Sequence, residues 1–185
     1  MKRIVLAALL GVITMGTVVY AADAQDNSLQ YTENVLEDGS LIYYFDEVAV
    51  TLPADWNGKF DIETDMTTAT FYHKASREKW MEEEGMEGGV LFSLSSSVNH
   101  DFAELPDFHY IGFSEESCMN YFLTFPTDMQ AYMDDSAVLE EFQQMNLEID
   151  FVKEHAYMLG QEVPAEESSD VSLIEYWNLK KKNLP

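Results

Sequence analysis

The strongest constraint on the fold is the order of two patterns: short runs with strand character come first, and one long helical stripe follows. The helical segment covers about 136–156 and repeats apolar residues at spacings of four and three. This spacing puts them on one face of a helix. The repeating residues are Val138, Phe142, Met145, Ile149, Val152 and Ala156. We expect this face to pack on a core that the preceding strands supply.

The runs before the helix are rich in aromatic and β-branched residues and are separated by turn residues. We predict strand structure in the runs 31–36, 41–52, 59–65, 67–73, 90–98, 110–113 and 118–125. The alternation within 48–52 predicts a half-buried strand. A short helix is expected from Ser76, as its N-cap, to about Glu84. The predicted class is α+β: an antiparallel β-sheet packed on one face by a long amphipathic helix and a shorter helix.

The N-terminal residues 1–21 have the layout of a secretory signal peptide. Lys2 and Arg3 precede an uncharged, mostly apolar stretch, and small residues follow, so that cleavage is expected after Ala21, with Ala24 as a second site. An uncleaved membrane anchor is the alternative, because the stretch is nearly long enough to span a bilayer. With cleavage, the protein is expected to be secreted, either extracellular or at the cell envelope.

The rest of the chain divides into three parts. Residues 22–30 form a polar lead-in, 31–156 the α+β domain, and 157–185 an acidic loop and C-terminal segment. Within the last part, 171–179 fits either a final helix or an added edge strand.

Acidic residues outnumber basic ones by far, which excludes several kinds of partner. The chain holds 34 Asp and Glu against 10 Lys and Arg, a net charge of −24. Nucleic-acid binding depends on Lys and Arg, so we expect no nucleic-acid partner. The same charge opposes stable association with an anionic membrane surface after signal cleavage. The single cysteine, Cys118, allows no internal disulfide, so stability must come from packing.

Motifs for enzyme chemistry are incomplete, and the sequence predicts no catalytic, cofactor-binding or metal-binding residues. The four histidines show no zinc-ligand spacing, and the acids from Asp61 to Asp65 lack the glycine and glutamate of a calcium loop. Ser114 lacks the second glycine of a nucleophile elbow. Cys118 and His109 are the best nucleophile and base pair, because both lie on one predicted hairpin.

Several aromatic residues offer a second kind of site, a platform for a glycan or a peptide. They are Trp56, Tyr72, Trp80, Tyr132 and Trp177. Most of them lie at the ends of predicted elements, where they can also cover the core, and we expect the core role.

Four short motifs carry a family resemblance. They are VTLPADWNGK at 50–59, FYHKAS at 71–76, GGVLFSL at 88–94 and FPTDMQ at 125–130. In this order they resemble a family of uncharacterised small secreted proteins of Gram-positive anaerobes, over about residues 41–156. The resemblance implies an α+β domain and an extracellular location, and no activity. The Leu-Pro-x-x-Trp motif ending at Trp56 is also similar to PsbP-like domains, which are sheet-and-helix sandwiches used for binding.

From these observations we expect a secreted, non-enzymatic binding module at the cell envelope or outside the cell. Its partner is an unidentified envelope or extracellular protein, peptide or glycan. The alternative function is a cysteine-dependent hydrolase that uses Cys118 and His109.

Overall fold

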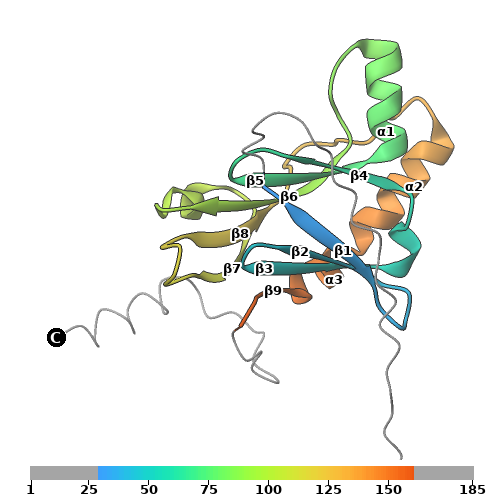
Figure 1. Ribbon diagram of the computed structural model, residues 1–185. Helices are drawn as coiled ribbons and strands as arrows, with labels where there is room; N and C mark the ends of the chain where they lie inside the picture. Colours follow the sequence, from blue (N-terminus) through green and yellow to red (C-terminus); the bar gives the residue numbers. More distant parts are fainter. Residues whose placement is uncertain (1–28, 161–185) are drawn as a thin grey trace, which may run out of the picture.

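The strands form two antiparallel sheets in the computed structural model, which describes residues 29–160 (Figure 1). The first sheet has the strand order β1-β2-β3-β9, and the second has the order β4-β5-β6-β8-β7. Their bounds are β1 Tyr31–Val35, β2 Leu41–Phe45, β3 Val48–Leu52, β4 Phe60–Thr64, β5 Thr68–His73, β6 Val90–Ser97, β7 Phe108–Phe113, β8 Asn120–Thr124 and β9 Ala156–Met158. The α+β class is confirmed, with two sheets where one was predicted.

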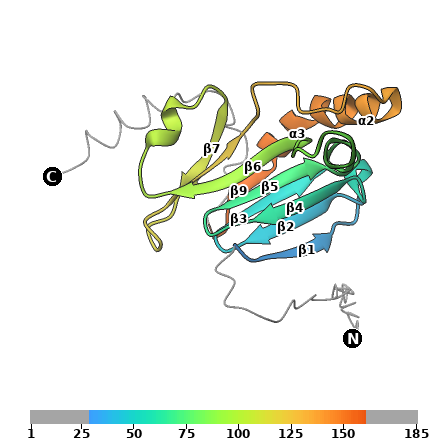
Figure 2. The same ribbon diagram turned by 90° about the horizontal axis from the view of Figure 1, so that it is seen from above.

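Short helices connect and flank the sheets. They are the 3-10 turns η1 (Ala54–Trp56) and η3 (Asp101–Glu104), the helices α1 (Lys74–Lys79), α2 (Ser136–Leu147) and α3 (Ile149–Glu154), and the π-helical turn η2 (Trp80–Glu84). Helices α1 and α2 contact each other at one end of the sheets (Figures 1 and 2). No helix within residues 29–160 is long and apolar enough to cross a membrane.

The main core lies between the two sheets. Alternate residues of each strand point inward, because side chains along a strand alternate between its faces. Phe71 of β5 stacks on Phe92 of β6 with ring centroids 4.3 Å apart, and Tyr43 of β2 meets Phe71 edge-on at 6.0 Å. Burial of such aromatic side chains contributes strongly to the stability of a domain that has no internal disulfide.

The predicted strand 41–52 is wrong as one continuous element. It is split at Asp46 and Glu47 into β2 and β3, which pair antiparallel with Leu41 opposite Leu52. All five residues of β3 are buried, so the prediction that 48–52 is half-buried is also wrong. The reason is that β3 has the second sheet on one side and contacts α3 as well.

The apolar stripe of the long helix is confirmed in its centre and corrected at its end. Phe142, Met145, Ile149 and Val152 are buried against the core. The helix is interrupted at Glu148, which separates α2 from α3, and helical structure ends at Glu154. Ala156 begins strand β9, which pairs with β3, so the folded domain extends past 156 to Met158. The predicted signal peptide 1–21 and the segment 171–179 lie outside the described residues.

The two sheets meet along one edge. Strand β9, at the edge of the first sheet, contacts β7, at the edge of the second. Gly112 makes this approach possible, because a Cβ at this position would lie 2.5 Å from Cγ of Met158. At the opposite edges, within the described residues, no strand joins β1 to β4. A single backbone hydrogen bond from Leu29 to the carbonyl of Asp65 links the chain before β1 to the end of β4.

A hydrogen bond between η1 and the helix break at Glu148 should contribute measurably to the unfolding free energy. The fully buried Trp56 donates its indole N–H to Oε2 of Glu148 at 2.7 Å. Trp56→Phe keeps an aromatic ring but loses this bond to a charged acceptor and some volume, so we expect about 2–3 kcal/mol lower unfolding free energy. Urea denaturation measures it. Glu148→Gln, which keeps an acceptor oxygen, should cost about 1 kcal/mol or less, and equal losses would contradict the role of the bond.

Candidate functional site

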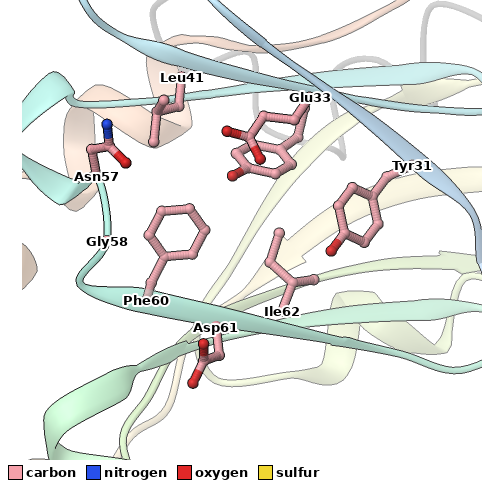
Figure 3. A pocket seen from close by; sticks show the side chains of 9 residues that line it. Tyr31, Glu33, Leu41, Asn57, Gly58, Phe60, Asp61 and Ile62 are labelled. Carbon is pink, nitrogen blue, oxygen red and sulfur yellow. The ribbon is translucent and has the colours of Figure 1, made fainter. Parts of the chain in front are cut away.

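A cleft opens where the two sheets separate, between β1, β2 and β4 (Figure 3). Its volume is about 350 Å³, in the range of small-ligand sites. The lining residues are Tyr31, Glu33, Leu41, Tyr43, Asn57, Gly58, Phe60, Asp61 and Ile62.

Three aromatic rings form the walls of the cleft. The ring of Tyr31 lies 5.6 Å from that of Tyr43, and Tyr43 meets Phe60 edge-on at 5.7 Å. Tyr43 is 4% exposed and belongs to the core, whereas Tyr31 is 41% exposed and stands at the mouth. The rings therefore run from the closed core to solvent, and Tyr31 is the ring most open to solvent.

The charge in the cleft is negative. The carboxylate of Glu33 lines the cleft beside Tyr43, with which it shares a hydrogen bond. Among the described residues that line the cleft, none is a lysine or an arginine. The neighbouring Lys59 lies toward α2 instead, with its Nζ 3.8 Å from Glu141. Asp61 stands at the rim, where its side chain points away from the other lining residues (Figure 3).

The two tyrosines respond to this environment. Burial raises the pKa of Tyr43, and a hydrogen bond to Glu33 together with the charge of that carboxylate raises it further. Burial also raises the pKa of Tyr31, and the charges of Glu33 and Asp61 add to the effect. Both phenols therefore stay neutral near pH 7. The carboxylate charge that opposes a phenolate here attracts a cation, whereas burial disfavours either charged group.

The structure assembles a second polar group that the sequence did not predict. Nδ1 of the fully buried His73 lies 2.8 Å from Oγ of Ser76, and its Nε2 lies 3.0 Å from Oε1 of Glu141. The Oγ of Ser76 also accepts the backbone N–H of Tyr132 at 3.2 Å, so its proton is directed at Nδ1. This leaves the ring proton on Nε2, where it is donated to Glu141.

This serine-histidine-glutamate group supports structure and does not resemble a working hydrolase site. Ser76 has no exposed surface, so a substrate has no access to its oxygen. Its hydroxyl and backbone N–H both bond to His73. His73 is thus the N-cap of α1, and the prediction that Ser76 caps this helix is wrong. The imidazole caps the helix because its ring nitrogen accepts the free N–H of Ser76, the third residue of the helix.

The structure places Cys118 and His109 apart. His109 pairs with Leu123 in the β7–β8 ladder, while Cys118 is exposed in the turn before β8 with a φ of 58°. Four residue steps along β7 separate His109 from Phe113 at the turn end, a span of roughly 10–13 Å at about 3.3 Å per residue. The Sγ of Cys118 instead contacts the carbonyl of Glu115 at 3.8 Å. The hydrolase hypothesis lacks the contact that it requires.

The other residues singled out in the sequence have structural surroundings. Trp56, Tyr72 and Tyr132 are buried, as the core role predicts, Trp80 is half-buried, and Trp177 lies outside the described residues. Ser114 donates to the carboxylate of Glu47, which also accepts from Ser117 and Tyr121. Within residues 29–160, no three His, Cys, Asp or Glu side chains are grouped as metal ligands would be.

The cleft residues escaped the sequence analysis because they come from two different sheets. One signal was present: Tyr31 and Glu33 alternate with polar residues, so they share a face of their strand. That the opposite wall is Phe60 depends on how the two sheets are placed, which no local pattern encodes.

Comparison of the chain with protein-family models, with curated proteins and with solved structures finds no match.

The His73 group predicts a pH-dependent stability. Burial lowers the pKa of His73, more than its bond to Glu141 raises it. The unfolded chain binds this proton below about pH 6.5 and the folded chain does not, so stability falls as the pH drops below that value, by up to about 1.4 kcal/mol per pH unit. Urea denaturation between pH 7 and pH 5 measures the slope.

His73→Asn is the matched variant, because asparagine caps a helix but does not titrate. It should be less stable at pH 7 and show a shallower slope. The pKa of His109 is also lowered, by burial and then by Lys153, and this contribution remains in both proteins. Parallel pH profiles for the two proteins would show that His73 does not titrate as stated.

Proposed function

We propose that this protein is a non-enzymatic binding module that holds a cationic group, such as a lysine or arginine side chain, in the cleft between its two sheets. One observation carries the proposal: the carboxylate of Glu33 and the rings of Tyr31, Tyr43 and Phe60 line the same cleft, without a lysine or arginine among the described lining residues. Aromatic faces and a carboxylate are the groups that bind ammonium and guanidinium ions.

The affinity expected for one cationic side chain follows from the contributions of the aromatic rings and the carboxylate. A cation over an aromatic face contributes about 0.5–2 kcal/mol, and a partly exposed ion pair about 0.2–1 kcal/mol. A single side chain would therefore bind only in the millimolar range. A biological partner must add further contacts around the cleft, which favours a protein or peptide over a free amine.

We also propose that the protein works outside the cytoplasm, secreted or at the cell envelope. The support is the tripartite N-terminal leader, the small residues Ala21, Ala22 and Ala24 that follow it, and the acidic composition of the rest of the chain. The negative charge further favours basic partners and disfavours nucleic acid.

The cleft is tested with a minimal cation. Nα-acetyl-lysine N-methylamide should shift amide NMR signals of β1 and β4 with a millimolar dissociation constant, and the norleucine analogue, which has no charge, should bind at least fivefold more weakly. Glu33→Gln should weaken lysine binding about fivefold, and Tyr31→Leu about threefold. Both residues are exposed, so the fold should survive.

The control is Glu104→Gln, which removes the same charge from η3 at a site remote from the cleft lining. It should leave binding within twofold of the wild type. If Glu33→Gln and Glu104→Gln weaken binding equally, the attraction is a property of the overall charge, and the cleft is not the site.

Export is tested separately. The full chain, expressed in a bacterial host with its own leader, should appear outside the cytoplasm with the intact mass of a chain beginning at Ala22. A cleavage-site variant, Ala21→Leu, should accumulate uncleaved protein or shift cleavage to Ala24. Full-length wild-type protein that stays in the cytoplasm would contradict the proposed location.

A further inference from the structure

The hairpin of β1 and β2 determines which backbone groups of β1 face outward. The N–H of Leu36 donates to the carbonyl of Ser40 at 2.8 Å, and the N–H of Gly39 donates to the carbonyl of Leu36 at 3.0 Å. Leu36 and Ser40 are thus the hydrogen-bonded pair that closes the hairpin. In an antiparallel ladder such pairs alternate, so Asn34 and Thr32 bond to β2.

It follows that Tyr31, Glu33 and Val35 direct their N–H and C=O groups to the outer edge of β1. In the described residues no strand pairs with this edge. All five residues of β1 are exposed. The edge of β4 is less open, because Leu29 bonds to Asp65 at its end and Phe60 and Ile62 pack against the core.

Strand β1 carries one charged side chain, Glu33, but lacks other devices that protect an edge. Natural sheets discourage added strands with lysine, proline or a bulge at the edge. The sequence of β1, Tyr-Thr-Glu-Asn-Val, contains neither residue, and its pairing with β2 is uninterrupted. A second copy of this chain is a poor occupant, because it would bring another Glu33 and a net charge of −24 to the same place.

The edge and the cleft meet at the same residues. Tyr31 and Glu33, whose backbone groups face outward, also line the cleft with their side chains. A strand added beside β1 would place alternate side chains on the face that points into the cleft. A basic side chain at such a position would reach the carboxylate of Glu33 and the ring of Tyr31 (Figure 3).

We propose that the partner is an extended peptide segment that adds to the free edge of β1 as a further strand and places one lysine or arginine side chain in the cleft. This inference rests on the proposed function and deepens it. The backbone bonds supply the affinity that a single cation lacks, and the cleft supplies selectivity for a basic residue.

The probe is a capped nine-residue peptide that alternates threonine and valine around one central lysine. Isothermal titration with the full mature chain should show binding at least tenfold tighter than that of Nα-acetyl-lysine N-methylamide. The backbone amides of the peptide fall into two alternating sets, of which one faces β1. N-methylation of the set that faces β1 should weaken peptide binding at least tenfold. N-methylation of the other set should change it less than threefold.

A protein variant tests the same contact from the other side. Val35→Pro removes an outward N–H and leaves the bonds to β2 in place, because proline is tolerated on the free side of an edge strand. It should weaken peptide binding at least fivefold and leave binding of Nα-acetyl-lysine N-methylamide unchanged. Thermal unfolding confirms that the variant is folded.

The outcomes separate the two proposals. If the peptide binds no more tightly than the lysine amide, or if both N-methylated sets bind like the parent, strand addition is overturned while the cationic cleft stands. If replacing the central lysine by norleucine leaves peptide affinity unchanged, the cationic cleft itself is overturned, and this inference with it.

Discussion

The arrangement of the molecule depends on the contact between Met158 and Gly112, where the edges of the two sheets meet. Met158 of β9 occupies space that a side chain at Gly112 would fill, so β9 lies against β7. Strand β9 follows α3 almost directly, and α3 contacts β3, so the helix fixes the position of this edge. Because the sheets are joined here, their other edges, β1 and β4, stay apart and the cleft lies between them.

The cleft continues the core rather than forming a separate hollow. The ring of Tyr43 contacts Phe71 of the core on one side and Phe60 and Tyr31 of the cleft on others. The inner walls are therefore held by the same packing that stabilises the domain, and little ordering is needed when a ligand enters. Tyr31 and Glu33 stand on the exposed edge, where binding can be altered without disturbing the core.

Periodicity predicted the elements whose cause is local. The hairpin closed by Gly39 and the buried stripe through Phe142 and Val152 follow from turn chemistry and helical spacing. The division of 41–52 at Glu47 did not, because strand-forming residues continue on both sides, and the turn is held by side chains from the distant β7–β8 hairpin. Strand β9 was not predicted, because its first residue, Ala156, continues the helical spacing of apolar residues.

The candidate site was beyond sequence reasoning for a related reason. Its walls come from two sheets, and the relative placement of sheets depends on contacts such as that of Met158 with Gly112, which lie 46 positions apart. The bond of His73 to Glu141 spans 68 positions in the same way. What the sequence did indicate, a large excess of acidic residues, agrees with the presence of Glu33 and Asp61 among the cleft residues.

The most direct test of the account is to locate a bound lysine side chain by intermolecular nuclear Overhauser effects, using a lysine peptide labelled at its side-chain methylenes. We predict contacts from these methylenes to the rings of Tyr31, Tyr43 and Phe60. Contacts only to other surfaces, such as the exposed Met81 and Met86 of the η2 region, would contradict it.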